Sequence, residues 1–175
     1  MSQAETRKIF DTASTLYNRR LSFAGDVVDH IHQISMGYPY FAQLIGKRCV
    51  EHGNIEGAND IGNYILNAVL EEIADGRAFP VLEQKYQQAI GDSEGRVLLL
   101  TLLAEEDIAI DDVDGGISLK AIRATAQDLN IEHMDQLVPR LIDRKFGPAL
   151  VRKQDQRGTY EFLDPVLRAY VRLRR

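Results

Sequence analysis

Apolar side chains recur at every third or fourth position through the first half of the chain. This is the period of a helix that buries one face, rather than the period of a strand, so the pattern predicts helices there. The five segments that follow it span residues 4–20, 25–35, 40–53, 59–76 and 79–91. Asp26 is the candidate N-cap of the second segment, and Asn59 or Asp60 of the fourth. The first half therefore predicts four amphipathic helices and a short connector helix.

The second half changes pattern after the turn-forming stretch at residues 91–95. Its six segments span residues 95–107, 118–129, 133–146, 148–153, 159–163 and 164–175. The first is too apolar for a surface helix, which predicts a central, buried one. Ser118 is the candidate N-cap of the second, and Leu129 is expected to point inward. The fourth and fifth are β-type runs joined by a polar turn of hairpin length, and the last helix opens with Asp164 and Pro165.

Three helices followed by a hairpin is the order of a winged helix-turn-helix domain. We therefore expect a mainly α fold, in which a helical bundle precedes a winged helix-turn-helix domain with a two-stranded β-hairpin. The expected divisions are a helical subdomain over residues 1–78, a connector helix over 79–91 and the winged-helix domain over 92–175.

Composition and cysteine use indicate the class of protein. Hydrophobic residues make up 45% and charged residues 27% of the 175 residues, as in an ordinary globular domain. No apolar run approaches the roughly 20 residues of a membrane span, and the N-terminus lacks a signal peptide core. A single cysteine, Cys49, agrees with a reducing compartment and is expected to be a buried thiol. We expect a cytoplasmic protein without a membrane partner.

Motifs for catalysis and metal binding are absent from the sequence. No glycine-rich stretch ends in the Gly-Lys-Ser/Thr of a phosphate-binding loop. His30 and His32 are two residues apart on an expected helix, so they point to different faces and cannot share one metal ion. No nucleophile has a recognisable base beside it. We therefore expect no catalytic residues, no metal site and no enzymatic activity in this chain.

Gly37, Tyr38 and Pro39 interrupt what would otherwise be one long helix. Glycine permits a backbone conformation that other residues avoid, and proline fixes φ at the start of the next helix. That helix would present its first N–H groups, which carry partial positive charge. The corner therefore either faces a nucleotide or is an ordinary helix–helix corner with Tyr38 and Tyr40 packed locally.

The segment SMGYPYFAQLIGKRC (residues 35–49) resembles the small helical lid of AAA+ and STAND-type ATPases, including the archaeal and bacterial relatives of the Orc/Cdc-type initiators. RVLLLTLLAEED, the helix-turn-helix after it and YEFLDPVLRAYV are similar to the winged helix that follows the lid in these proteins. The resemblance covers nearly the whole chain. It implies that Gly37, Tyr38 and Pro39 form the nucleotide-facing corner of the lid.

The same resemblance implies that the phosphate-binding core lies on an N-terminal P-loop domain, which the chain lacks. The chain would then be the non-catalytic C-terminal regulatory portion of an ATPase and would couple the nucleotide state to a partner or to DNA. ATP and Mg²⁺ would belong to the parent protein, and this chain would bind no cofactor. The alternative is a stand-alone DNA-binding winged-helix transcription regulator with a helical effector or dimerisation half.

Charge is distributed unevenly over the second half. Residues 92–138 hold 3 basic and 11 acidic side chains, whereas residues 139–175 hold 10 basic and 4 acidic ones. The candidate DNA or partner contacts are Arg140, Arg144, Lys145, Arg152, Lys153, Arg157, Arg172 and Arg174.

Two uses of the winged helix compete. Its basic side chains would neutralise DNA phosphates. Against DNA stand Pro139 inside or near the start of the third helix, the acidic Asp135 and Asp143 on it, and the acidic segment at residues 111–114. These features favour a protein-interaction or regulatory module, and the DNA interpretation stays open.

Overall fold

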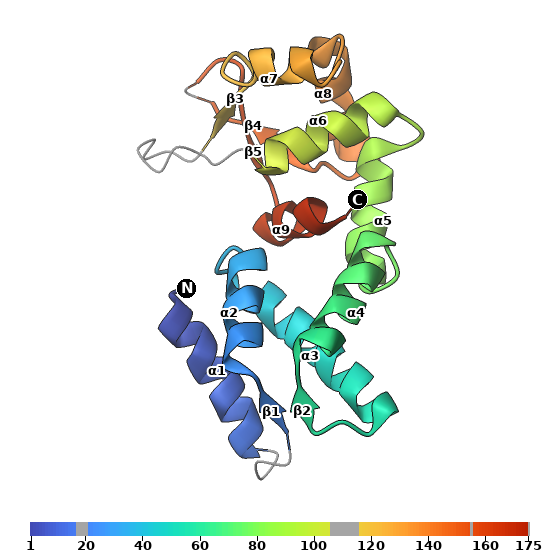
Figure 1. Ribbon diagram of the computed structural model, residues 1–175. Coiled ribbons are helices and arrows are strands. Elements are labelled where there is room, and N and C mark those ends of the chain that lie inside the picture. Colours follow the sequence, from blue (N-terminus) through green and yellow to red (C-terminus); the bar gives the residue numbers. More distant parts are fainter. Residues whose placement is uncertain (17–20, 106–115, 155, 175) are drawn as a thin grey trace. The chain divides into compact units, whose positions relative to one another are not determined.

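The computed structural model describes residues 1–16, 21–105, 116–154 and 156–174. These residues are mainly helical, with nine α-helices and two small sheets (Figure 1). They form two compact units, one of Met1–Phe79 with the C-terminal residues from Leu173, and one of Pro80–Arg172. Within the described parts of the chain, no helix combines the length and apolarity that crossing a bilayer requires.

The first unit contains four helices and a pair of short strands. In chain order they are α1 (Gln3–Leu16), β1 (Ser22–Phe23), α2 (Gly25–Ile34), α3 (Pro39–Glu56), β2 (Asp60–Ile61) and α4 (Asn63–Ala74). The helices agree with the apolar period. The parallel pairing of β1 with β2 was not predicted, because a two-residue strand shows no alternation. Phe41 and Ile45 of α3 and Ile65 and Val69 of α4 are completely buried and form the core.

The strand pair explains why the predicted N-caps are wrong. The cap of α2 is Ala24 rather than Asp26, and the cap of α4 is Gly62 rather than Asn59 or Asp60. Asp60 lies in β2, where its carboxylate accepts a hydrogen bond from the Ser22 hydroxyl. The pairing of β1 with β2 therefore places Asp60 in a strand, although the local sequence favours it as a helix cap.

Charged side chains join helices of the first unit at two places. Arg7 of α1 donates to both carboxylate oxygens of Asp29 on α2, at 2.9 and 2.7 Å. Arg48 of α3 donates from Nε to Glu72 of α4 at 2.8 Å, and Nε2 of His52 lies 3.1 Å from the other oxygen of the same carboxylate. Only 15% of the Glu72 side chain is exposed, so this second contact is partly shielded from water.

The second unit contains the remaining elements. They are α5 (Pro80–Ile90), α6 (Glu94–Glu105), β3 (Ile117–Ser118), α7 (Arg123–Asp128), α8 (Met134–Ile142), a 3₁₀ turn (Arg144–Phe146), β4 (Leu150–Arg152), β5 (Thr159–Phe162) and α9 (Pro165–Leu173). The expected hairpin is present as the antiparallel pair β4–β5. β3 adds a third strand, which gives the sheet order β3-β5-β4. Ser118 belongs to β3 and is not a helix cap, because α7 begins only at Arg123.

The core of the second unit forms around α6. Leu99, Leu100 and Leu103 are completely buried, as the apolar run predicted. Leu129 is 46% exposed and does not point inward as expected, because it caps the short α7 at its C-terminal end. Asp164 caps α9 as predicted, since its Oδ1 accepts a hydrogen bond from the Val166 N–H at 2.9 Å.

Glu72 generates a prediction about stability and pH. The Arg48 guanidinium, helped by His52, lowers the pKa of Glu72. A carboxyl whose pKa is lowered by folding stabilises the fold above its unfolded pKa, near 4.3, and this stabilisation is lost as pH falls through the lower folded pKa. We expect Glu72→Gln to reduce the free energy of unfolding by roughly 1–3 kcal/mol at pH 7 and by less near pH 3.5.

Urea unfolding followed by circular dichroism at both pH values measures this difference. The matched control is Glu71→Gln, since Glu71 is the exposed neighbour of Glu72. It should stay within about 0.5 kcal/mol of the unsubstituted chain at pH 7. Equal losses for the two variants would contradict the prediction.

Candidate functional site

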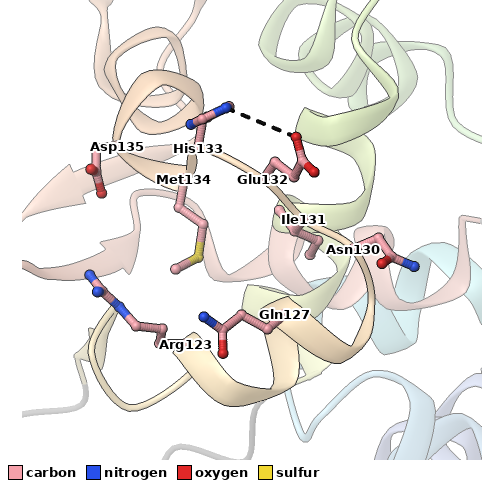
Figure 2. A pocket seen from close by; sticks show the side chains of 8 residues that line it. All are labelled: Arg123, Gln127, Asn130, Ile131, Glu132, His133, Met134 and Asp135. Atoms are coloured by element: carbon pink, nitrogen blue, oxygen red, sulfur yellow. Dashed lines mark ion pairs between the residues drawn. The ribbon is translucent and has the colours of Figure 1, made fainter.

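An open pocket of about 550 Å³ lies where α7 turns into α8 (Figure 2). The turn is sharp because Asn130 and His133 both have positive φ, at 55° and 53°. Ile131 and Met134 are buried and supply its apolar base. The other lining side chains are polar and come from both helices and the turn: Arg123, Gln127, Asn130, Glu132, His133 and Asp135. Such a pocket can hold a polar side chain of a partner against an apolar floor.

The rim of the pocket carries opposite charges. Glu132 and Asp135 stand at the start of α8, and Arg123 stands at the start of α7. Nε2 of His133 lies 3.9 Å from the Glu132 carboxylate, and both side chains are mostly exposed. An exposed pair at this distance holds neither group in place. The carboxylates of the rim are therefore free to meet a basic group.

Helix α8 has one buried and one exposed face. Met134, Val138 and Leu141 are buried, with the spacing of an amphipathic helix. Asp135, Gln136 and Pro139 are exposed, and Pro139 lies inside the helix. A partner that contacts this face would therefore meet one carboxylate, one amide and one proline.

Arg140 does not lie on that exposed face. Its Nη2 donates to the Gln88 carbonyl of α5 at 3.3 Å, and its Cζ stands 3.9 Å from the centre of the Phe146 ring. Its Nε is buried and has no hydrogen-bond partner in the described part of the chain. The sequence placed Arg140 among the DNA contacts, whereas in the structure this guanidinium packs against α5.

Further basic candidates of the second unit lie on the 3₁₀ turn after α8 and on the hairpin. Arg144 and Lys145 are exposed on the 3₁₀ turn after α8. On the hairpin, Arg152 is exposed beside Tyr160, with Nη2 3.4 Å from the phenol oxygen, and Lys153 is half-buried. Arg157, in the turn of the hairpin, is exposed.

The C-terminal candidates belong to other parts of the chain. Arg172 is half-buried on α9. Nη1 of Arg174 donates to the Ala74 carbonyl at the end of α4, within the first unit. The acidic segment at residues 111–114, which was expected to repel DNA, lies outside the described residues.

The corner between α2 and α3 forms as the sequence indicates. Gly37 has φ of 68° and donates its N–H to the His32 carbonyl at 3.2 Å, which ends α2. Pro39 is the first residue of α3, and Tyr40 is 61% exposed rather than packed locally. A Cβ at Gly37 would stand 2.8 Å from the Met1 carbonyl oxygen. The backbone that leads into α1 therefore packs against the corner.

The isolated titratable groups of the first unit have structural partners. Cys49 is completely buried, and burial raises the pKa of its thiol to about 12, which makes it a poor nucleophile. Nδ1 of His32 lies 2.8 Å from the hydroxyl of the buried Thr6. The described residues contain no group of three His, Cys, Asp or Glu side chains that could hold a metal ion.

Comparisons with known proteins assign no function to these residues. No family model matches the chain, and neither a curated protein nor a solved structure matches it. The sequence did not predict that Glu132 and His133 line a pocket, because this depends on how α7 turns into α8. Asn130 was the one local indication of a sharp turn here, since asparagine adopts positive φ more often than most residues.

The corner generates a prediction with a matched control. An L-residue at φ near +70° costs roughly 1–2 kcal/mol, and this cost applies equally to Gly37 and to Gly57, at φ of 68° and 70°. Gly57 has open space where a Cβ would stand, whereas Gly37 has the Met1 carbonyl oxygen 2.8 Å away. We expect Gly37→Ala to reduce the free energy of unfolding by about 1 kcal/mol more than Gly57→Ala.

Urea unfolding of the two variants measures this difference. Equal losses would mean that the segment around Met1 moves away at no cost and does not pack on the corner.

Proposed function

We propose that the second unit is a winged helix-turn-helix domain that contacts a protein rather than DNA. We further propose that the chain is the non-catalytic regulatory portion of an AAA+ or STAND-type ATPase. The order α6-β3-α7-α8-β4-β5 and the sheet order β3-β5-β4 support the first part, because a winged helix has this succession and its first strand pairs with its last.

The exposed face of α8 is the observation that carries the choice of a protein partner. A helix that reads the major groove needs Arg, Lys, Asn or Gln side chains on that face, and neighbouring cations for the phosphates. Here Asp135 and Pro139 occupy it together with Gln136, while Arg140 packs against α5. Glu132 adds a second carboxylate at the start of the helix. A phosphate backbone would meet like charge at this face, and a basic group of a protein would meet opposite charge.

The corner of the first unit supports the link to nucleotide state. Pro39 and Tyr40 are exposed at the beginning of α3, and the first N–H groups of a helix carry partial positive charge that suits a phosphate. In the proposed ATPase, a P-loop domain at this corner would also meet the segment around Met1, which lies against Gly37. ATP and Mg²⁺ would be held mainly by that domain, and the corner would sense them.

A stand-alone DNA-binding regulator is the second candidate. Four exposed cations favour it: Arg144 and Lys145 after α8, and Arg152 and Arg157 on the hairpin. These could contact the phosphate backbone without base readout. This use would need no other domain, and it would give binding that weakens steeply with salt.

A gel shift at about 50 mM salt separates the two candidates. We expect no shift of random duplex DNA by the unsubstituted chain. Replacing the two carboxylates at the start of α8, in the double variant Glu132→Lys/Asp135→Lys, should create salt-dependent binding, because the exposed cations after α8 and on the hairpin would then act together. A shift by the unsubstituted chain that disappears in Arg152→Gln/Lys153→Gln would support DNA and overturn the protein-partner proposal.

Calorimetry with ATP and Mg²⁺ tests the proposed lid. The sequence contains no phosphate-binding loop, so this chain would supply only the corner of a nucleotide site. We expect no saturable heat at ATP concentrations up to several millimolar, about the limit set by a binding free energy near −4 kcal/mol. Saturable binding at millimolar or lower ATP would show that the chain holds a complete nucleotide site and would contradict its assignment as a lid portion.

A further inference from the structure

Two arginine side chains of the second unit converge on Gly91, between α5 and α6. The position that a Cβ on Gly91 would occupy lies 2.8 Å from Nη2 of Arg140 and 3.3 Å from Nη2 of Arg96. Arg140 comes from α8 and Arg96 from the first turn of α6. Two guanidinium groups from different helices thus approach one backbone position that has no side chain.

Backbone carbonyl groups of α5 hold both guanidinium groups in place. Nε of Arg96 donates to the Ile90 carbonyl at 2.5 Å, and Nη2 of Arg140 donates to the Gln88 carbonyl at 3.3 Å. The ring of Phe146 lies against the Arg140 guanidinium, with its centre 3.9 Å from Cζ. These contacts restrict the motion of the two side chains before any ligand binds.

The pair lacks a matching negative charge. Neither Arg96 nor Arg140 forms an ion pair with a carboxylate in the described residues. Burial and the charge of Arg140 lower the pKa of Arg96, and the charge of Asp92 has a smaller effect in the opposite direction. The buried Nε of Arg140 has no hydrogen-bond partner among the residues that the structure describes. Buried donors in folded proteins are nearly always paired, so this atom lacks the acceptor that is usual for it.

Capping of α5 explains only part of this arrangement. Cations near the C-terminal end of a helix interact favourably with its carbonyl groups, and one arginine would suffice for that. Capping does not explain why two guanidinium groups approach each other, nor why Nε of Arg140 has no acceptor within the described part of the chain.

We propose that Arg96 and Arg140 form a binding site for a phosphate group beside Gly91. A phosphate dianion matches the two positive charges, and planar guanidinium groups donate two hydrogen bonds at a time to its oxygens. Any side chain at Gly91 would stand against both guanidinium groups, so glycine is the residue that keeps them clear of a neighbouring side chain. The phosphate is either free inorganic phosphate or the phosphate of a modified side chain on a partner protein. This site is independent of the face of α8 that the proposed function uses.

Calorimetric titration of the full chain with inorganic phosphate, at constant ionic strength, tests the site. We expect saturable binding with a dissociation constant of about 1 mM or lower. Arg96→Gln should weaken phosphate binding at least tenfold. Arg96→Lys keeps the charge but loses the paired N–H donors of the guanidinium, so it should weaken binding less. Arg157→Gln removes an exposed cation of the hairpin turn and should leave the affinity unchanged. Circular dichroism establishes that each variant is folded.

A second titration with N-acetyl-phosphoserine amide distinguishes the sources. Tighter binding than inorganic phosphate identifies a phosphorylated side chain as the ligand, and equal or weaker binding identifies free phosphate. No saturable binding of either compound overturns the proposal. So does binding that Arg157→Gln weakens as much as Arg96→Gln, because that result would reflect general attraction to positive charge.

Discussion

The Arg140 guanidinium lies between Phe146 and the last turn of α5, and the surface chemistry of the second unit follows from this contact. Arg140 is the one cation within α8, so its removal from the exposed face leaves Asp135, Gln136 and Pro139 there. The same contact brings Arg140 to Gly91 and to Arg96. One side-chain direction thus determines both the acidity of the helix face and the position of the arginine pair.

That direction depends on how α5 is fixed to the rest of the second unit. Lys85 of α5 pairs with Asp164 at 2.7 Å, and the Tyr170 hydroxyl donates to Glu83 of α5 at 2.5 Å. Nε of Arg168 donates to the Ala104 carbonyl near the end of α6 at 3.2 Å, which joins α9 to the central helix. Helix α9 therefore holds α5 and α6 together. The connector helix of the sequence analysis is an integral part of this core, and the carbonyl groups that receive the two arginines are positioned by it.

Periodicity predicted the helices well, because the apolar spacing of an amphipathic helix is a local property. The buried α6 and the β4–β5 hairpin could likewise be predicted, from an apolar run and from a polar turn between β-type residues. The β1–β2 pair and β3 could not, since their partners lie far away in the sequence and two-residue strands have no period. The predicted winged-helix assignment and the functional role of the Gly37 corner stay predictions.

The candidate site was harder to predict for the same physical reason. Charge counts correctly drew attention to the basic C-terminal part, but they cannot show where a long side chain points. Arg140 is separated from Gln88 by 52 positions, and Arg174 from Ala74 by 100, so neither contact leaves a local signal. The basic residues cluster in the C-terminal part of the sequence, but only some of them are exposed on the surface of the fold.

The second unit carries charges of opposite sign on two sides of one helix, and this restricts its partners. Glu132 and Asp135 at the start of α8 attract a cation, whereas Arg140 and Arg96 attract an anion. A nucleic acid satisfies only the second requirement and is repelled at the first, because phosphates line its whole length. A protein can present a basic side chain and a phosphorylated or free anion at separate points. Under the proposed function, this unit would distinguish a protein partner from DNA by the pattern of its charges rather than by its net charge.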